Sequence, residues 1–254
     1  MNQNIVTKIK NLRPIDDIFF QKLMEDIQVC QEMLQVILED DSLVVESVTP
    51  QNSIKNLQGR SVRLDALCTL GNGRKCNIEV QKEDNDNHVK RVRYNASCIT
   101  ANITKTGSSF EDVPDVCIVY LSMFDFLKGD KTIYHTKKIL QETGASVEDG
   151  LQEIYVNTEI YDGTNISELM QCMKQETIAN RKFPALARRV NYYKESQEGV
   201  DTMCDVMKEL IEERDKEIII NLLKQGCSYD MIARAYYISE DAVKEIEQLA
   251  LQMA

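Results

Sequence analysis

The sequence contains only two histidines, no Cys-x-x-Cys pair and no long apolar run. A zinc site of cysteine and histidine therefore has little support, because such sites need both residue types at close spacing. The longest apolar runs, such as residues 116–121, fall far short of the roughly 20 residues that cross a bilayer. Basic residues are outnumbered, with 30 Lys and Arg against 41 Asp and Glu and a net charge of −11. These features argue against a membrane partner and against a wholly basic surface for unspecific nucleic-acid binding.

The remaining composition is that of an ordinary globular protein. Hydrophobic residues make up 43% and charged residues 28% of 254 positions, which suits one large domain or a domain with an appendage. The eight cysteines lie mostly in apolar stretches, as in Leu67-Cys68, and are interpreted as reduced thiols of the core. Residues 1–4 lack the apolar run of a secretory signal, so we expect a cytoplasmic protein.

Apolar residues at helical spacing over residues 15–40 predict one long amphipathic helix, with Pro14 at its first position. The Val-rich segment 43–48 predicts a strand that ends at Pro50. Four further elements follow from the same periodicities: a helix over about 85–105, a strand buried on both faces over 114–122, and strands over 132–139 and 152–160.

The composition changes near Asn165, after which the pattern is helical to the end. The change predicts a mixed α/β domain over residues 1–164 and a helical region over 165–254. In that region Gly226 is placed to end one helix, and Ser228 and Ser239 are placed to cap two more, a pattern similar to a helix-turn-helix.

The charge of this tail argues against DNA binding by it. Residues 201–254 carry twelve acidic and six basic residues, and the last predicted helix has Lys244 as its only cation. Such a helix would repel DNA phosphates. We therefore favour packing, or association into a homo-oligomer through the C-terminal helices, over DNA contact.

Two runs of alternating residues, 61–70 and 75–81, flank a Gly-Asn-Gly turn and predict a β-hairpin. A two-residue loop would place Asp65 on the face of Val80 and mix polar with apolar rows. A three-residue loop, with Gly73 in the left-handed conformation, places Asp65 opposite Glu79 and aligns the apolar rows. Because a one-residue slip moves a whole row to the wrong face, burial favours the three-residue loop.

In this register Asp65 and Glu79 have Cβ atoms ~5 Å apart, and Gln81 follows on the same face. Two carboxylates at this distance repel each other unless a cation compensates them. Mg²⁺ or Mn²⁺ suits the pair, since these ions take oxygen ligands from one or two carboxylates, water and phosphate. A solvated pair of acids on an exposed sheet face is the simpler interpretation.

The charge around this pair favours a phosphodiester substrate. Residues 51–105 contain ten basic and five acidic residues, within a chain that is acidic overall. Cations bind a nucleic-acid backbone, and a metal ion activates water for hydrolysis. A solvated helix face accounts for some of these cations but not for their coincidence with the acidic pair.

Several strings carry a resemblance to a known family. The strings 63–66 (Arg-Leu-Asp-Ala) and 77–81 (Asn-Ile-Glu-Val-Gln) resemble the active strands of the PD-(D/E)XK nuclease superfamily. More narrowly, the chain is similar to the recombination-promoting nucleases and transposases of bacteria. Asp16 to Phe19 resembles their D-x-x-F start, and the basic-aromatic string 90–94, Gly107 and segment 114–121 follow in the family's order. The resemblance covers roughly residues 12–160.

The resemblance implies a restriction-endonuclease-like α/β fold, with a mixed sheet flanked by helices. It implies Asp65 and Glu79 as catalytic metal ligands, with the carbonyl of Val80 as a further ligand. Gln81 stands where the superfamily usually has lysine. Because glutamine cannot act as a general base, water activation would fall to the metal, and Gln81 would orient water or phosphate. Asp16 would add a catalytic carboxylate, although the helix dipole alone also favours an acid there.

The candidate substrate contacts are cations around this site and one aromatic residue suited to stacking on a base: Arg63, Lys82, Arg91, Arg93 and Tyr94. Of the first two, the pleat places Arg63 on the site face and Lys82 on the other. His88 is a candidate proton shuttle, although a histidine on the helix surface is the more ordinary interpretation.

The function that these features predict is a Mg²⁺- or Mn²⁺-dependent DNA endonuclease with a role in recombination or transposition. The alternative is a catalytically inactive nuclease fold that acts as a DNA- or protein-binding module. Cleavage of DNA that depends on the metal and on Asp65 would distinguish the two.

Overall fold

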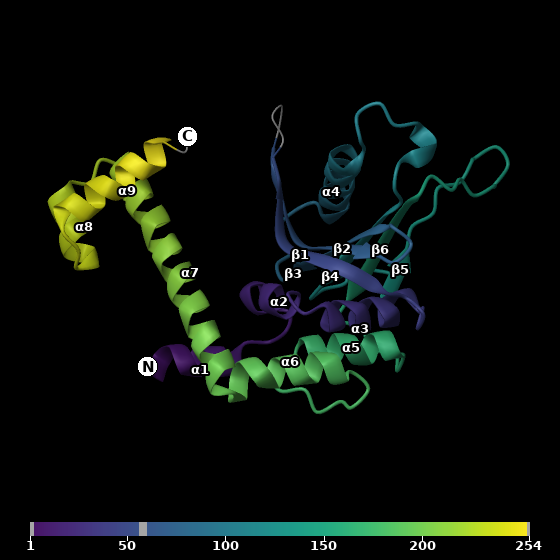
Figure 1. Cartoon of the computed structure of the whole chain (residues 1–254), viewed down its shortest axis with the longest axis horizontal. Coiled ribbons are helices and arrows are strands. Elements are labelled where there is room, and N and C mark those ends of the chain that lie inside the picture. The colour runs from purple at the N-terminus through teal and green to yellow at the C-terminus, as the bar shows by residue number, and fades with distance from the viewer. Residues whose placement is uncertain (1–2, 56–59, 253–254) are drawn as a thin grey trace. The chain divides into compact units, whose positions relative to one another are not determined.

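A mixed sheet of six strands lies at the centre of the larger part of the chain, within residues 3–55 and 60–252 that the computed structural model describes (Figure 1). The strand order is β1-β2-β3-β4-β6-β5. β3, β4 and β6 are parallel, whereas β1, β2 and β5 are antiparallel to their neighbours. The strands span Val45–Ile54 (β1), Val62–Leu70 (β2), Lys75–Gln81 (β3), Val116–Ser122 (β4), Ile133–His135 (β5) and Leu151–Asn157 (β6).

Helices cover both faces of the sheet (Figure 1). α4 links β3 to β4 and lies on one face, where its apolar residues pack against Ile118 and Tyr120 of β4. α2, α3, α5 and α6 lie on the other face. Because of this cover, every residue of β4 is buried, as the apolar sequence of that strand predicts. These helices span Asp17–Leu23 (α2), Ile27–Leu38 (α3), His88–Ile103 (α4), Asn165–Met173 (α5) and Pro184–Glu195 (α6), and Phe110–Asp112 forms a short 3₁₀ turn (η1).

The hairpin between β2 and β3 has the register that the sequence predicts. Ala66 pairs with Ile78, and the pairing continues in step to the end of the ladder. The loop is therefore residues 71–73, and Gly73 is left-handed with φ 81°. Along β2 the buried residues alternate with more exposed ones, as the burial argument requires.

The N-terminal segment differs from the expected single helix over 15–40. The chain forms α2 and α3, with a break between Leu23 and Ile27. The Asp26 side chain accepts a hydrogen bond from the Gln28 N–H and caps the start of α3. Pro14 lies three residues before the first residue of α2 instead of opening the helix. The apolar periodicity continues across the break because both helices bury residues against the same sheet.

The first strand is also longer than expected, because β1 continues through Pro50 to Ile54. Proline is tolerated here since β1 is an edge strand, where every second N–H points away from the sheet. The next residue, Gln51, is left-handed with φ 50°. At the other edge, β5 covers only three residues of the predicted 132–139, whereas α4 and β6 are close to their predicted spans.

The compact units divide the chain at 9/10 and 192/193, not at the composition change near residue 165. The helices after Asn165 belong to the sheet unit because they are tied to its helices. The Ile15 N–H donates to the Met173 carbonyl at 3.0 Å, and the Glu32 carboxylate accepts from two N–H groups at the start of α6. Composition therefore marks a change in secondary structure and not the limit of the unit.

The second unit is helical and contains α7 (Gln197–Lys224), α8 (Tyr229–Tyr236) and α9 (Glu240–Gln252), with most of α1 (Gln3–Asn11). Ile232 of α8 and Val243 of α9 pack on Ile219 of α7, as in a helix-turn-helix. The Ser228 and Ser239 hydroxyls accept hydrogen bonds from the first turns of α8 and α9, as the sequence predicts. Among the helices of the described ranges, none combines the length and apolar character that a membrane span requires.

Candidate active site

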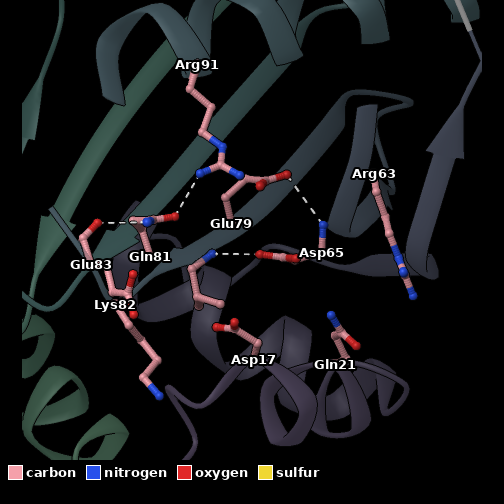
Figure 2. Close-up of a pocket in the computed structure, with 10 residues that line it drawn as sticks. Asp17, Gln21, Arg63, Asp65, Glu79, Gln81, Lys82, Glu83 and Arg91 are labelled. Atoms are coloured by element: carbon pink, nitrogen blue, oxygen red, sulfur yellow. Dashed lines mark hydrogen bonds between the residues drawn. The ribbon is translucent and has the colours of Figure 1, made fainter. Parts of the chain in front are cut away.

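Two carboxyl groups meet where β2 and β3 separate (Figure 2). Among the described residues the ladder between these strands ends at Ala66–Ile78. Beyond it, side chains bind the main chain of the other strand. The Val80 N–H donates to Asp65 Oδ2 at 2.9 Å, and the Asp65 N–H donates to Glu79 Oε1 at 3.4 Å. The hairpin therefore brings Asp65 and Glu79 together, as its register predicts.

These acids line a pocket of about 310 Å³ between the ends of the strands, α2 and α4. Most of its wall is polar and charged, and Figure 2 shows Arg91 reaching in from α4 while Asp17 and Gln21 face it from α2. The lining residues are Asp17, Gln21, Arg63, Asp65, Glu79, Val80, Gln81, Lys82, Glu83 and Arg91.

Burial and neighbouring negative charges raise the pKa values of the two acids. Burial raises the pKa of Glu79 well above its usual range, and the charge of Asp65 raises it further. Burial also raises the pKa of Asp65, although the hydrogen bond from Val80 opposes this. The positive charge of Arg91 lowers the pKa of both groups, but by less than burial raises it. The pair therefore holds a proton near neutral pH unless a cation enters.

Asn77 constrains the carboxylate of Glu79. It is fully buried on the same face of β3 and donates from Nδ2 to Glu79 Oε1 at 2.8 Å. Its own Oδ1 has no partner within the described residues. A buried polar atom without a partner costs about 1–3 kcal/mol. Asn77 thus orients Glu79 at the expense of stability.

The donor set of the pocket fits a hard divalent cation. The Gln81 carbonyl accepts from the N–H of Met123, the residue after β4. Because successive carbonyls of a strand point to opposite sides, the Val80 carbonyl points away from β4, toward β2 and the two acids. Two carboxylates, one carbonyl and water are typical Mg²⁺ ligands. In the described ranges, no group of three or more His, Cys, Asp or Glu residues is placed to hold a metal. Water and substrate would have to complete the shell.

Gln81 is held at both ends of its carboxamide. Its Oε1 accepts from Arg91 Nη1 at 2.8 Å, and its Nε2 donates to the Glu83 carbonyl at 2.8 Å. These contacts fix Gln81 as a support for the guanidinium of Arg91. The positive charge next to Gln81 is that of Arg91, which belongs to α4.

Asp16 does not line the pocket. Its carboxylate accepts from Lys82 Nζ at 2.7 Å and from Arg13 Nη2 at 3.1 Å. The next residue, Asp17, lines the pocket instead, and its charge raises the pKa of Asp65. The sequence alone does not distinguish two adjacent acids near the start of a helix. Asp16 precedes α2 and Asp17 is its first residue, so their side chains point in different directions.

The candidate substrate contacts fall into two groups. Arg63, Lys82 and Arg91 line the pocket, although Lys82 is paired with Asp16. Lys82 reaches the pocket despite the expected pleat because β3 ends at residue 81. Arg93 and Tyr94 lie outside the lining. Arg93 is exposed on α4, and the Tyr94 hydroxyl donates to the Arg60 carbonyl.

Sequence reasoning missed four of the residues that shape the site: Asp17, Gln21, Asn77 and Glu83. Of these, Asn77 carried a usable signal, because it lies two residues before Glu79 in the same strand and thus on the same face. The others come from a helix start and from the segment after β3, where no periodicity fixes the side-chain direction.

Comparison with protein families gives one relationship. A family model described as "PD-(D/E)XK nuclease family transposase" matches residues 14–183, which is more than half of the chain and includes every residue of the pocket. Comparisons with curated proteins and with solved structures gave no significant match.

Proposed function

Because this chain belongs to the PD-(D/E)XK nuclease family of transposases, we propose that it is a Mg²⁺- or Mn²⁺-dependent endonuclease that hydrolyses phosphodiester bonds of DNA, with a role in recombination or transposition. The observation that carries the proposal is the pair of neighbouring carboxylates, the buried Glu79 and the half-buried Asp65, in a pocket that also contains two arginines. Such a pair of acids is costly in isolation and is explained by a cation that both of them bind.

Asp65, Glu79 and the Val80 carbonyl would hold the ion. When bound, the ion supplies charge stabilisation to the phosphate and lowers the pKa of a coordinated water. Asn77 keeps the Glu79 carboxylate oriented toward this position. Asp17 lies close enough for its charge to act on Asp65, and it is suited to bind through a water molecule.

The cations of the pocket would bind and orient DNA. Arg91 is supported by Gln81 and faces the two acids, so it is placed to contact the phosphate that the ion also contacts. Arg63 enters from β2 and contacts the Gln51 carboxamide. The exposed Arg93 and the adjacent Tyr94 extend the basic surface along α4, where they suit the DNA backbone farther from the scissile bond.

Nicking of supercoiled plasmid DNA tests this proposal. We expect the purified chain to nick with Mg²⁺ or Mn²⁺ and to stop in EDTA. Asp65→Asn and Glu79→Gln should each lower the rate at least about 100-fold, because each removes a charged ligand. Asp41→Asn, at an exposed acid on the α3–β1 connection, is the matched control and should nick at the normal rate.

Two results would contradict the proposal. Normal nicking by Asp65→Asn or Glu79→Gln would remove these residues from the mechanism. DNA or protein binding without cleavage in any divalent metal would favour the alternative, in which the nuclease fold serves only as a binding module.

A further inference from the structure

A glutamine of β1 links two residues of the pocket wall. Gln51 is half-buried, and its Nε2 donates to Oε1 of Gln21 on α2. Its Oε1 accepts from Nη2 of Arg63 on β2. Gln21 and Arg63 line the pocket, and Figure 2 shows both of them on the side of the two acids that lies away from Gln81. One carboxamide therefore joins α2 to β2 beside the acids.

The pairing of β1 with β2 explains why Gln51 reaches the pocket. The ladder runs in step on both sides of Gln51, which places this residue opposite Asp65. Directly opposite residues of an antiparallel pair share a face of the sheet, and so do residues two apart in one strand. Gln51 of β1 and Arg63 of β2 therefore belong to the row of side chains that contains Asp65.

The backbone of Gln51 has a conformation that residues with a side chain disfavour. Its φ is 50°, in the left-handed region. Such a conformation persists where the surrounding contacts require it, and it is frequent beside functional sites. Glycine would supply the same bend without strain, whereas the link between Gln21 and Arg63 needs a side chain with both a donor and an acceptor.

The link holds an exposed cation in one direction. Arg63 is exposed, and a long side chain that is free in solution loses rotamer freedom when it binds a ligand. A contact that already holds the side chain removes part of this cost. A guanidinium has several N–H donors, so the one that binds Gln51 leaves others for a phosphate. Arg63 and Arg91 enter from different sides of the acids and thus suit different phosphates of a DNA strand (Figure 2).

We propose that Gln51 is a positioning residue that holds Arg63 for a DNA phosphate next to the scissile phosphate that Arg91 contacts. This inference rests on the proposed nuclease function, because it specifies how that site binds its substrate. It adds a residue of the edge strand β1 to the site. A contact with a neighbouring phosphate is the same before and during hydrolysis, so it should affect DNA affinity and not the chemical step.

DNA binding in EDTA tests the inference without cleavage. Fluorescence anisotropy of a short labelled duplex gives the Kd of the intact chain at rising salt. Arg63→Ala should raise Kd about 10-fold and lower the slope of log Kd against log salt by about one, because one phosphate contact is lost. Gln51→Ala should raise Kd about 3- to 10-fold. Asn52→Ala removes a carboxamide from the next residue of β1 and is the matched control, with a normal Kd.

Nicking kinetics should show a corresponding division between KM and kcat. For Gln51→Ala we expect KM for plasmid to rise about as much as Kd, with kcat within about twofold of the wild type. A lower kcat at an unchanged KM would overturn the inference, because Arg63 would then act on the reacting phosphate. Normal values of both constants would overturn it as well.

Glycine at position 51 separates the carboxamide from the bend of the backbone. Gln51→Gly accepts the left-handed φ without strain, so it should melt at a higher temperature than Gln51→Ala. Both variants lack the carboxamide and should bind DNA equally weakly. Normal DNA binding by Gln51→Gly would assign the effect to the backbone conformation and would overturn the inference.

A double variant tests the route through Arg63. In an Arg63→Ala background, Gln51→Ala should raise Kd no further, because the cation that it positions is already absent. Losses that multiply would show that Gln51 acts independently of Arg63, which contradicts a positioning role.

The same measurements separate this inference from the proposed function. If the wild type binds DNA but does not nick it in Mg²⁺ or Mn²⁺, and Gln51→Ala binds more weakly, the role of Gln51 in DNA binding stands and the nuclease proposal fails. If the wild type nicks DNA and Gln51→Ala has a normal Kd, the nuclease proposal stands and this inference fails. A wild type that binds no DNA overturns both.

Discussion

At the scale of single residues, the main feature is a pair of acids that the fold keeps close together, which lowers the stability of the metal-free protein. Burial raises the pKa values of Asp65 and Glu79, and a neighbouring negative charge raises each of them further, that of Asp17 for Asp65 and that of Asp65 for Glu79. The folded chain therefore binds protons that the unfolded chain releases above about pH 4. The stability of the metal-free protein must then depend on pH in a defined direction.

We expect the metal-free protein to lose stability as pH rises from about 4 through about 6 and about 8, the pKa values of Asp65 and Glu79. The penalty is complete above the higher value, where both groups are charged in both states. Mg²⁺ binds the ionised pair, so its stabilising effect should grow over the same window. Thermal melts in EDTA and in Mg²⁺ between pH 5 and 8.5 measure both trends.

The double variant Asp65→Asn/Glu79→Gln provides the control for this titration. It should lack the loss of stability that is specific to the pair, and its melting temperature should respond little to Mg²⁺ at any pH. A wild-type melting temperature in EDTA that follows the double variant across this window would contradict the raised pKa values.

The acidic pair was predictable because two constraints agree on it. Strand alternation and the burial of one face of the hairpin fix the register, and the register fixes which acids meet. No comparable constraint separates Asp16 from Asp17, or predicts that His88 is buried. The direction of His88 depends on Phe124 and Phe126, which follow β4 and are more than 30 residues away in sequence.

At the scale of elements, the loop of the β2–β3 hairpin sets the register of the two strands, and this register determines the geometry of the site at their other end. Its three-residue loop depends on Gly73, whose φ of 81° is costly for residues with a side chain. A Cβ at Gly73 would meet no atom within 4 Å, so the cost of substitution is conformational and not steric.

Gly73→Ala should therefore destabilise the protein by about 1–2 kcal/mol, measured by urea unfolding. Gly71→Ala, in the same loop, is the control. Gly71 has no positive φ, and its added Cβ would make an ordinary contact of 3.6 Å with Val44. Equal stabilities for the two variants would show that the left-handed residue does not fix the loop.

The elements that differ from the sequence prediction do so for tertiary reasons. The break between α2 and α3 depends on Asp26 acting as a cap, although acids also occur within helices. Pro50 would end a strand only if the N–H that proline lacks were needed to pair with a neighbouring strand. The sequence does not show that β1 lies at an edge of the sheet, where this donor is not needed. Local patterns predicted the types of most elements, whereas their limits depend on neighbours.

At the scale of the whole molecule, α7 offers a surface for self-association. Ile211 and Ile218 lie two turns apart on one side of this helix and are 38% and 36% exposed, and Leu210 beside them is 47% exposed. The second unit is too acidic to bind DNA readily. We therefore expect its helices to join copies of the chain.

Light scattering of the full chain should give twice the monomer mass of 29.1 kDa at micromolar concentration. Ile211→Glu should shift the mass toward the monomer, because it places a charge in the apolar stripe. Asn221→Glu adds the same charge at an exposed polar position of α7 and should leave the mass unchanged. A monomer at every concentration would contradict self-association.

The edges of the sheet limit how such copies can meet. Along β1, Pro50 removes one hydrogen-bond donor, and the left-handed Gln51 turns the backbone out of the extended conformation. The opposite edge, β5, is only three residues long. Neither edge offers a continuous template on which a strand of another molecule could add, which protects the protein from amyloid-like growth when it is concentrated.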